Sequence, residues 1–212
     1  MFSGLIREIG KIHGYSGSKI QVACIYKPDI GDSIAVNGVC LTAISRETFG
    51  FSAELSMESK KSIALERFIP QSRVHIEPAL QVNARLDGHI VQGHIDCIGT
   101  ITQIIHTKEQ SDFFIRLENT ALDYVLPKGS VCVDGVSLTA GSKSVQGFGL
   151  TIIPHTLKNT LFKDYKVGMR VNIETDMFVR NAFSALKALV EKKDSTQYRL
   201  KWRDIDHIQM QF

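Results

Sequence analysis

One octapeptide occurs twice in this chain, and its recurrence constrains the fold more than any other feature. Residues 36–43 read VNGVCLTA and residues 133–140 read VDGVSLTA, so six of eight positions are identical at a separation of 97 residues. The two differences exchange one small polar side chain for another, Asn37 for Asp134 and Cys40 for Ser137. We therefore expect a duplicated scaffold with two non-identical polar sites, one in each copy.

The duplication extends beyond this octapeptide. Residues 58–59 align with 155–156, and residues 74–77 (VHIE) align with 171–174 (VNIE), again 97 apart. Gly10 and Gly99, near the start of each copy, are only 89 residues apart. The second copy therefore contains one insertion of eight residues between this glycine and the octapeptide. A chain of 212 residues accommodates two domains of about ninety residues each. We predict a first domain at 1–88, a second at 89–176, and a C-terminal helix and tail at 177–212.

The first copy consists mostly of short apolar or alternating runs separated by Gly, Pro, Asn and Ser, which is typical of antiparallel strands. Six such runs in one small domain favour a closed barrel, because closure removes exposed strand edges. The predicted fold class is mainly β, with two tandem six-stranded antiparallel Greek-key β-barrels and a C-terminal α-helix. The strands are expected at residues 5–13, 19–24, 33–36, 40–46, 50–55 and 74–78, with a short helix at 57–68.

Residues 177–193 place apolar side chains three or four positions apart, which predicts an amphipathic helix. The apolar stripe could pack against a barrel of the same chain or against another subunit, and its spacing does not choose between them. The remaining stretch, 194–212, contains the single tryptophan, Trp202, and shows no clear period. We expect a tail or an appendage there.

Composition narrows the classes of function. The net charge is +3 and is spread without a basic run, so neither nucleic acid nor an anionic membrane surface is indicated as a partner. The first ten residues resemble neither a signal peptide nor a membrane anchor, so cytoplasmic localisation is expected. The four cysteines form no CxxC pair, which argues for reduced thiols and against a thiolate zinc site.

The octapeptides place polar side chains beside a tight bend. Asn-Gly and Asp-Gly are strong hairpin signals, and in a following strand Cys40 and Thr42 share one face while Leu41 faces the other. Ser137 and Thr139 repeat this arrangement. Such edges suit a ligand, although small polar residues can equally fill space or bond to backbone next to a turn.

The junction of the two copies reads GHIVQGH, with His89 and His94 five residues apart. This spacing puts the imidazoles on opposite faces of a regular strand, so no metal site is expected. Each histidine could serve a separate environment, with Gly93 allowing close approach of a flat ligand. The alternative is a pair of solvent-facing residues in a linker.

Six separated motifs then resemble the riboflavin synthase family over residues 1–187: MFSG, VNGVCLTA, GHIVQGHID, KGSVCVDGVSLT, IIPHTLKNT and VNIETD. The resemblance implies two lumazine-binding barrels that transfer a four-carbon unit between two molecules of 6,7-dimethyl-8-ribityllumazine. Riboflavin and 5-amino-6-(D-ribitylamino)uracil would form without a metal or organic cofactor. It further implies a homotrimer joined by the C-terminal helix, with each active site between subunits, and leaves open an association with lumazine synthase.

The resemblance also implies the site residues. In the catalytic set, His94 would exchange protons with the substrate methyl group, Cys40 and Ser137 would stabilise or deliver an adduct or water, and Asp176 would act in the second barrel. The first site would comprise Phe2, Gly4, Leu5, Ile6, Cys40, Leu41, Thr42, Glu54, Leu55, Ser56, Met57, Glu58, Ser59, Gly93, His94 and Ile95. The second site would comprise Lys128, Ser137, Leu138, Thr139, Ile152, Ile153, Pro154, His155, Thr156 and Leu157.

The chain departs from the usual family pattern mainly at the rim of the first site. Ser56-Met57 stands where Met-Pro is usual, and Ile63 stands where a threonine is usual, although Thr160 keeps it in the second copy. Two other classes of function stay open. A non-catalytic carrier similar to the lumazine proteins would bind its ligand without turnover. A barrel for single-stranded nucleic acid would need a basic groove with aromatic stacking platforms, and a net charge of +3 with a single tryptophan gives this class little support.

Overall fold

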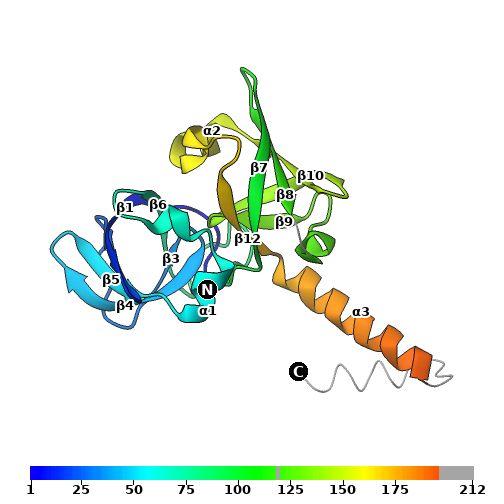
Figure 1. The fold of residues 1–212 in the computed structure, drawn as a ribbon, viewed down its shortest axis with the longest axis horizontal. Helices are drawn as coiled ribbons and strands as arrows, with labels where there is room; N and C mark the ends of the chain where they lie inside the picture. The colour runs from blue at the N-terminus through cyan, green and yellow to red at the C-terminus, as the bar shows by residue number, and fades with distance from the viewer. Residues whose placement is uncertain (118–119, 196–212) are drawn as a thin grey trace. The chain divides into compact units, whose positions relative to one another are not determined.

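The structure is a computed structural model that describes residues 1–117 and 120–195. It contains two closed barrels of six antiparallel strands each, and the strands follow the same ring order in both, so the predicted fold class is confirmed (Figure 1). The first barrel comprises β1 (Glu8–Ser16), β2 (Lys19–Ala23), β3 (Ser33–Val36), β4 (Val39–Glu47), β5 (Gly50–Glu54) and β6 (Arg73–Pro78). The second comprises β7 (Cys97–His106), β8 (Ser111–Leu117), β9 (Ser130–Val133), β10 (Val136–Ser144), β11 (Gly147–Ile152) and β12 (Arg170–Thr175).

Short helices connect the strands at equivalent places in the two copies. In the first copy these are α1 (Met57–Ser62) and η1 (Leu65–Phe68), and in the second they are α2 (Pro154–Asn159) and η3 (Leu161–Asp164). A further 3-10 helix, η2 (Thr120–Tyr124), follows β8. Each barrel encloses its own apolar core, because alternate residues of every strand turn inward.

The repeated octapeptides form the hairpins that join β3 to β4 and β9 to β10. Asn37 (φ 46°) and Gly38 (φ 78°) both lie in the left-handed region, as do Asp134 (φ 46°) and Gly135. Two consecutive residues of this kind make the tight turn predicted from the sequence. The two turns touch: a Cβ on Gly38 would lie 2.6 Å from the amide nitrogen of Gly135.

The barrels are joined around these turns by a crosswise set of buried hydrogen bonds. His75 Nδ1 lies 2.8 Å from the carbonyl oxygen of Asp134, and the amide of Leu161 donates to His75 Nε2 at 2.7 Å. These partners require Nδ1 to carry the proton. In the mirrored arrangement, the Asn172 side chain donates to the carbonyl of Asn37 at 2.9 Å and accepts from the amide of Ala64 at 2.7 Å.

In the first copy, two predicted elements differ from the observed ones by more than one residue. The first strand spans Glu8–Ser16 and not residues 5–13, and shortly before it the Gly4 amide bonds to the Glu77 carboxylate and not to the backbone of a neighbouring strand. The helix predicted at 57–68 is interrupted between α1 and η1, where Ile63 is extended (ψ 158°) and buried. The amide of Ala64 bonds to Asn172 of the other barrel, so a tertiary contact overrides the local helical pattern.

The helix predicted at 177–193 is α3 (Met177–Ser195), which ends two residues later than expected. Of the described residues, 178–195 belong to a unit separate from residues 1–177. The predicted tail lies outside the described residues from 196 onward, including Trp202. No helix among the residues described is long and apolar enough to cross a membrane.

Candidate functional site

The polar edge of each barrel lies on the strand that leaves the Asn-Gly or Asp-Gly turn. On β4, Leu41 is buried in the core while Cys40 is half-buried and Thr42 is exposed, as the alternation predicted. On β10, Ser137 is half-buried and Thr139 is exposed. Each barrel therefore presents a thiol or a hydroxyl next to a threonine.

Two stretches of backbone cross from one copy to the edge of the other copy. We call residues 2–5 the first crossing segment and residues 91–94 the second crossing segment. They pair with each other through an antiparallel bridge between Phe2 and Val91. The carbonyl of Gly4 accepts a hydrogen bond from the Ser137 amide at 2.8 Å, and the carbonyl of Gly93 accepts one from the Cys40 amide at 2.9 Å.

Glycine is required at both crossing points. Gly4 (φ 76°) and Gly93 (φ 81°) have left-handed backbones. A Cβ on Gly4 would lie 2.5 Å from the Cβ of Ser137, and a Cβ on Gly93 would lie 2.5 Å from the Cβ of Cys40. Any larger residue would push the polar edge away from the segment that crosses it.

A hollow of about 490 Å³ opens beside Ser137, a size that suits a small organic ligand. Among the predicted site residues, it brings together Ser137, His155 and Thr156 of the second copy with Gly4, Leu5 and Ile6 of the first. Gly4, Leu5 and Ile6 were predicted to join the Cys40 site, and the structure corrects that grouping, because the first crossing segment reaches the second barrel. The hollow is also lined by Arg7, Glu8, Ile9, Val136, Lys158, Asn159 and Thr160, which the sequence analysis missed.

The helical spacing of residues after His155 could have identified two of these additional lining residues. Lys158 and Asn159 follow His155 by three and four positions on α2, so they share its face. The Asn159 side chain donates to the carbonyl of His155 at 2.9 Å. Glu8 serves a structural purpose at this rim, since its carboxylate accepts from the amides of Ile25 (2.5 Å) and Tyr26 (3.0 Å).

The imidazole beside Ser137 belongs to His89, which is not among the predicted site residues. His89 Nδ1 lies 2.6 Å from the Ser137 hydroxyl, and His89 Nε2 is buried without a hydrogen-bond partner. Burial lowers the pKa of His89, while the nearby carboxylate of Asp176 acts in the opposite direction. His89, Ser137 and Asp176 are thus neighbours, and the neutral imidazole is the dominant form at neutral pH.

His94 lies in the second crossing segment and is exposed. It is equivalent to Leu5, which lines the hollow in the second barrel, because both follow the crossing glycine directly. By this equivalence His94 belongs beside Cys40 of the first barrel, together with Gly93 and Ile95. The interpretation of both histidines as solvent-facing is wrong for His89, which is only 9% exposed.

Other predicted residues of the first site differ in their burial and in their structural role. Leu41 and Leu55 are core residues, with 2% and 0% of their surface exposed. Ser56 caps the N-terminus of α1, where its hydroxyl accepts a hydrogen bond from the Ser59 amide at 3.0 Å. The remaining residues, Glu54, Met57 and Glu58, are exposed at the rim.

Phe2 differs from its predicted place. Its side chain is wholly buried in a small cluster with Ala35, Val91 and Cys132, against which Cys40 packs. A ring contact with a ligand is not available to a side chain without exposed surface. Phe2 instead holds the first crossing segment between the barrels.

The predicted residues of the second site also divide by exposure. Ile152 is buried in the core, and Leu138 and Leu157 are partly buried against it. Ile153, Pro154 and Thr139 are exposed. Lys128 is exposed and has a left-handed backbone (φ 66°) at the position where the first copy has Gly31 (φ 96°). A non-glycine residue with a left-handed backbone is strained. Such strained residues occur in ligand sites as well as in turns.

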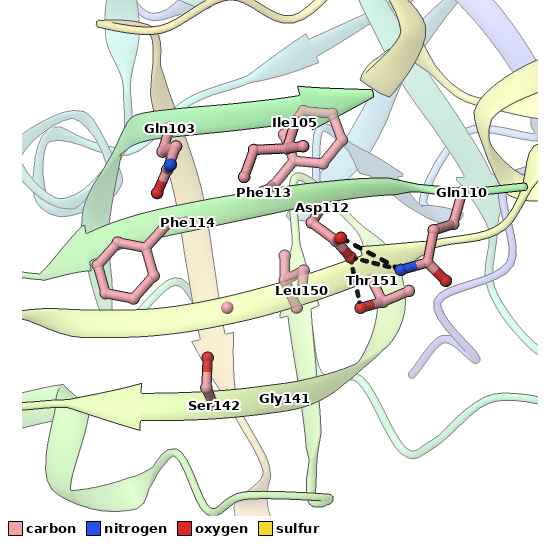
Figure 2. Close-up of a pocket in the computed structure, with 11 residues that line it drawn as sticks. Gln103, Ile105, Gln110, Asp112, Phe113, Phe114, Gly141, Ser142, Leu150 and Thr151 are labelled. Atoms are coloured by element: carbon pink, nitrogen blue, oxygen red, sulfur yellow. Dashed lines mark hydrogen bonds between the residues drawn. The ribbon is translucent and has the colours of Figure 1, made fainter. Parts of the chain in front are cut away.

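A second hollow, of about 340 Å³, lies on the outer face of the second barrel. Figure 2 shows it across β7, β8, β11 and β10, with Asp112 bonded to Gln110 and Thr151 on one side. None of the predicted site residues lines it. Within residues 1–117 and 120–195, no cluster of three or more His, Cys, Asp or Glu side chains is placed to hold a metal ion.

Comparison with known proteins agrees with this geometry. The lumazine binding domain family matches residues 3–79 and 92–176. The chain is 35% identical over 208 residues to the riboflavin synthase of Photobacterium phosphoreum, covering 94% of both chains. It is 37% identical over 184 residues to that of Actinobacillus pleuropneumoniae, covering 84% of this chain and 86% of the relative, and 32% identical over 200 residues to that of Bacillus subtilis, covering 91% and 93%.

The fold is also found among solved structures. A crystal structure of LumP complexed with riboflavin superposes with a TM-score of 0.74 at 17% identity, covering 82% of this chain and 99% of that chain. A complex of LumP with 6,7-dimethyl-8-(1'-D-ribityl) lumazine gives 0.72 at the same identity and coverage. Since full-length relatives at 32–37% identity are riboflavin synthases and the family match covers both barrels, the chain belongs to the riboflavin synthase family, with two lumazine binding domains in tandem.

Proposed function

We propose that this protein converts two molecules of 6,7-dimethyl-8-ribityllumazine into one riboflavin and one 5-amino-6-(D-ribitylamino)uracil by transferring a four-carbon unit. The relatives named riboflavin synthase support this reaction. The observation that carries the proposal is that the two barrels present edges of the same backbone geometry and different chemistry, a thiol on Cys40 and a hydroxyl on Ser137. Two sites of different chemistry suit a reaction in which two identical molecules take different roles, one as donor and one as acceptor. The two products together contain the atoms of two substrates, so the reaction needs no oxidant.

The catalytic demands are orientation and proton transfer. The C7 methyl group of the lumazine is acidic because its ring system delocalises the resulting anion, so a base and two well-placed rings suffice. His89 is neutral at neutral pH and bonded to Ser137, which equips it to take or return a proton directly or through the hydroxyl. Asp176 stabilises the imidazolium when it forms. In the first barrel, the imidazole assigned to the Cys40 site is that of His94, which stands at the position equivalent to Leu5 and not to His89.

The structure supplies a matched control for this role. His106 Nδ1 lies 2.7 Å from the Ser111 hydroxyl, the same kind of pair in the second barrel but away from the site. We expect His89→Gln to lower kcat about a hundredfold, in the range of general acid–base contributions, while His106→Gln leaves kcat unchanged. Wild-type kcat in His89→Gln would remove His89 from proton transfer.

The competing function is a carrier that binds a lumazine without converting it. A carrier needs one good pocket and no acid–base groups. This chain keeps Cys40, His94, Ser137 and Asp176 and adds the buried pair of His89 with Ser137, so catalysis accounts for more of the observed site. Equilibrium binding of one lumazine per chain with no riboflavin formed would favour the carrier.

We further propose a homotrimer assembled through α3, with residues 1–88 and 89–176 as the two ligand-binding domains. The apolar spacing along α3 and the family resemblance support this assembly. Four free cysteines suit a reducing compartment, so we place the protein in the cytoplasm. Association with lumazine synthase, the source of the substrate, is part of the same proposal. Native mass spectrometry of the full chain, alone and with lumazine synthase, tests both assemblies.

A further inference from the structure

Each barrel buries one glutamate near the end of its last strand. Glu77 on β6 and Glu174 on β12 are 97 residues apart in sequence and are 3% and 1% exposed. A buried carboxylate is costly unless several hydrogen bonds replace its water. The hydrogen-bond donors around these two carboxylates therefore show which parts of the backbone each glutamate fixes in place.

Both carboxylates accept hydrogen bonds from the crossing segments. The Glu77 carboxylate accepts from the Ser3 amide (2.8 Å), the Ser3 hydroxyl (2.7 Å) and the Gly4 amide (3.0 Å). The Glu174 carboxylate accepts from the amides of Gln92 (2.7 Å), Gly93 (2.8 Å) and His94 (3.1 Å). Each glutamate thus fixes one crossing segment by charge-assisted hydrogen bonds.

The carbonyls of the same segments reach the polar edge of the opposite barrel. Glu77 belongs to the first barrel, yet the segment it holds bonds to Ser137 of the second. Glu174 belongs to the second barrel, yet the segment it holds bonds to Cys40 of the first. The contact at each crossing glycine leaves no space for the edge to shift toward the segment.

We propose that Glu77 and Glu174 are positioning residues that act crosswise, each setting the ligand-facing edge of the barrel to which it does not belong. Their role in catalysis rests on the proposed function, whereas the crosswise positioning is a property of the fold. The bridge between Phe2 and Val91 joins the two crossing segments, so a change at either glutamate also has a smaller effect on the ligand-facing edge of its own barrel. The larger effect falls on the opposite barrel.

Amide hydrogen exchange of the full-length protein tests this directly, read by mass spectrometry on peptides that cover residues 36–43 and 133–140. Glu77→Gln keeps the side-chain shape but removes one acceptor oxygen and turns an amide group toward backbone donors. We expect exchange in 133–140 to accelerate about tenfold or more, with a smaller change in 36–43. Glu174→Gln is expected to give the reverse pattern.

A milder variant keeps the test informative if either substitution weakens the whole fold. Ser3→Ala removes only the hydroxyl bond to Glu77 and is expected to accelerate exchange in 133–140 by a smaller factor than Glu77→Gln. Faster exchange in 36–43 than in 133–140 for Glu77→Gln or Ser3→Ala would overturn the proposal, because the glutamate would then act within its own barrel. Equal acceleration at both edges by Ser3→Ala would overturn it as well.

Kinetics separates this proposal from the proposed function. If the protein forms riboflavin, Ser3→Ala lowers kcat/KM without moving its pH profile, because no proton-transfer group has changed. If the protein forms no riboflavin, the exchange pattern still decides whether the glutamates act crosswise.

Discussion

His75 makes the stability of the fold depend on pH. It is 1% exposed at the junction of the barrels, and both ring nitrogens are engaged in bonds that need the neutral imidazole. Burial is the main cause that lowers its pKa from 6.5 to about 3, and Arg67 and Arg73 act in the same direction. The bond to the Asp134 carbonyl opposes the shift.

The sign follows from proton binding. The folded pKa lies below the unfolded one, so the unfolded chain takes up the proton first as the pH falls. The stabilisation is fully present above pH 6.5 and is lost as the pH falls toward 3. Each pH unit in this window corresponds to about 1.4 kcal/mol, so acidification from pH 6.5 to pH 5 should remove about 2 kcal/mol from the free energy of unfolding.

The second copy suggests the control variant, His75→Asn, since Asn172 bridges the barrels from the equivalent position without a titrating group. The variant will lose some stability at every pH. Its free energy of unfolding should fall less steeply than that of the wild type between pH 6.5 and pH 5, by about 2 kcal/mol over the interval. Urea unfolding followed by circular dichroism at each pH measures this. Equal slopes in the two proteins would refute the account, because His89 and the carboxylates titrate in both.

Three further substitutions test the strained and asymmetric positions. Gly38→Ala should lower the free energy of unfolding by more than about 2 kcal/mol, because its Cβ would clash with the Gly135 backbone. Gly17 is also left-handed but has open space around it, so Gly17→Ala should lower the free energy of unfolding by only about 1 kcal/mol. Thermal unfolding of both variants measures the difference. Lys128→Gly should raise the free energy of unfolding by up to about 1 kcal/mol in urea while lowering kcat/KM, and an unchanged kcat/KM would place Lys128 outside the site. Cys40→Ser makes the two edges alike and should lower kcat, so turnover equal to the wild type would show that the thiol is not the functional asymmetry.

The parts of the fold that the sequence predicted correctly are those set by neighbouring residues. The turn at Asn37-Gly38 depends on two backbone conformations that few residues tolerate, and the alternation after it assigns Cys40 and Leu41 to opposite faces. Duplication then extends each local prediction to the second copy. The two barrels follow from such local signals repeated along the chain.

The errors occur where contacts span long stretches of sequence. Ser3 bonds to Glu77 across 74 residues and His89 bonds to Ser137 across 48, and no periodicity reports such pairs. Leu5 and Ile6 are apolar and resemble the start of a strand, so the first crossing segment and its place in the second site were missed. The interruption at Ile63 has the same origin, because its cause is Asn172 in the other barrel.

The central claim is that this chain is a synthase and not a carrier, and product stoichiometry tests it most directly. Purified full-length protein is incubated with a large molar excess of 6,7-dimethyl-8-ribityllumazine and no other reagent, and both products are quantified by chromatography. We predict one riboflavin and one 5-amino-6-(D-ribitylamino)uracil for every two lumazines consumed, over many turnovers per chain. Lumazine that stays bound and unconverted would contradict the account.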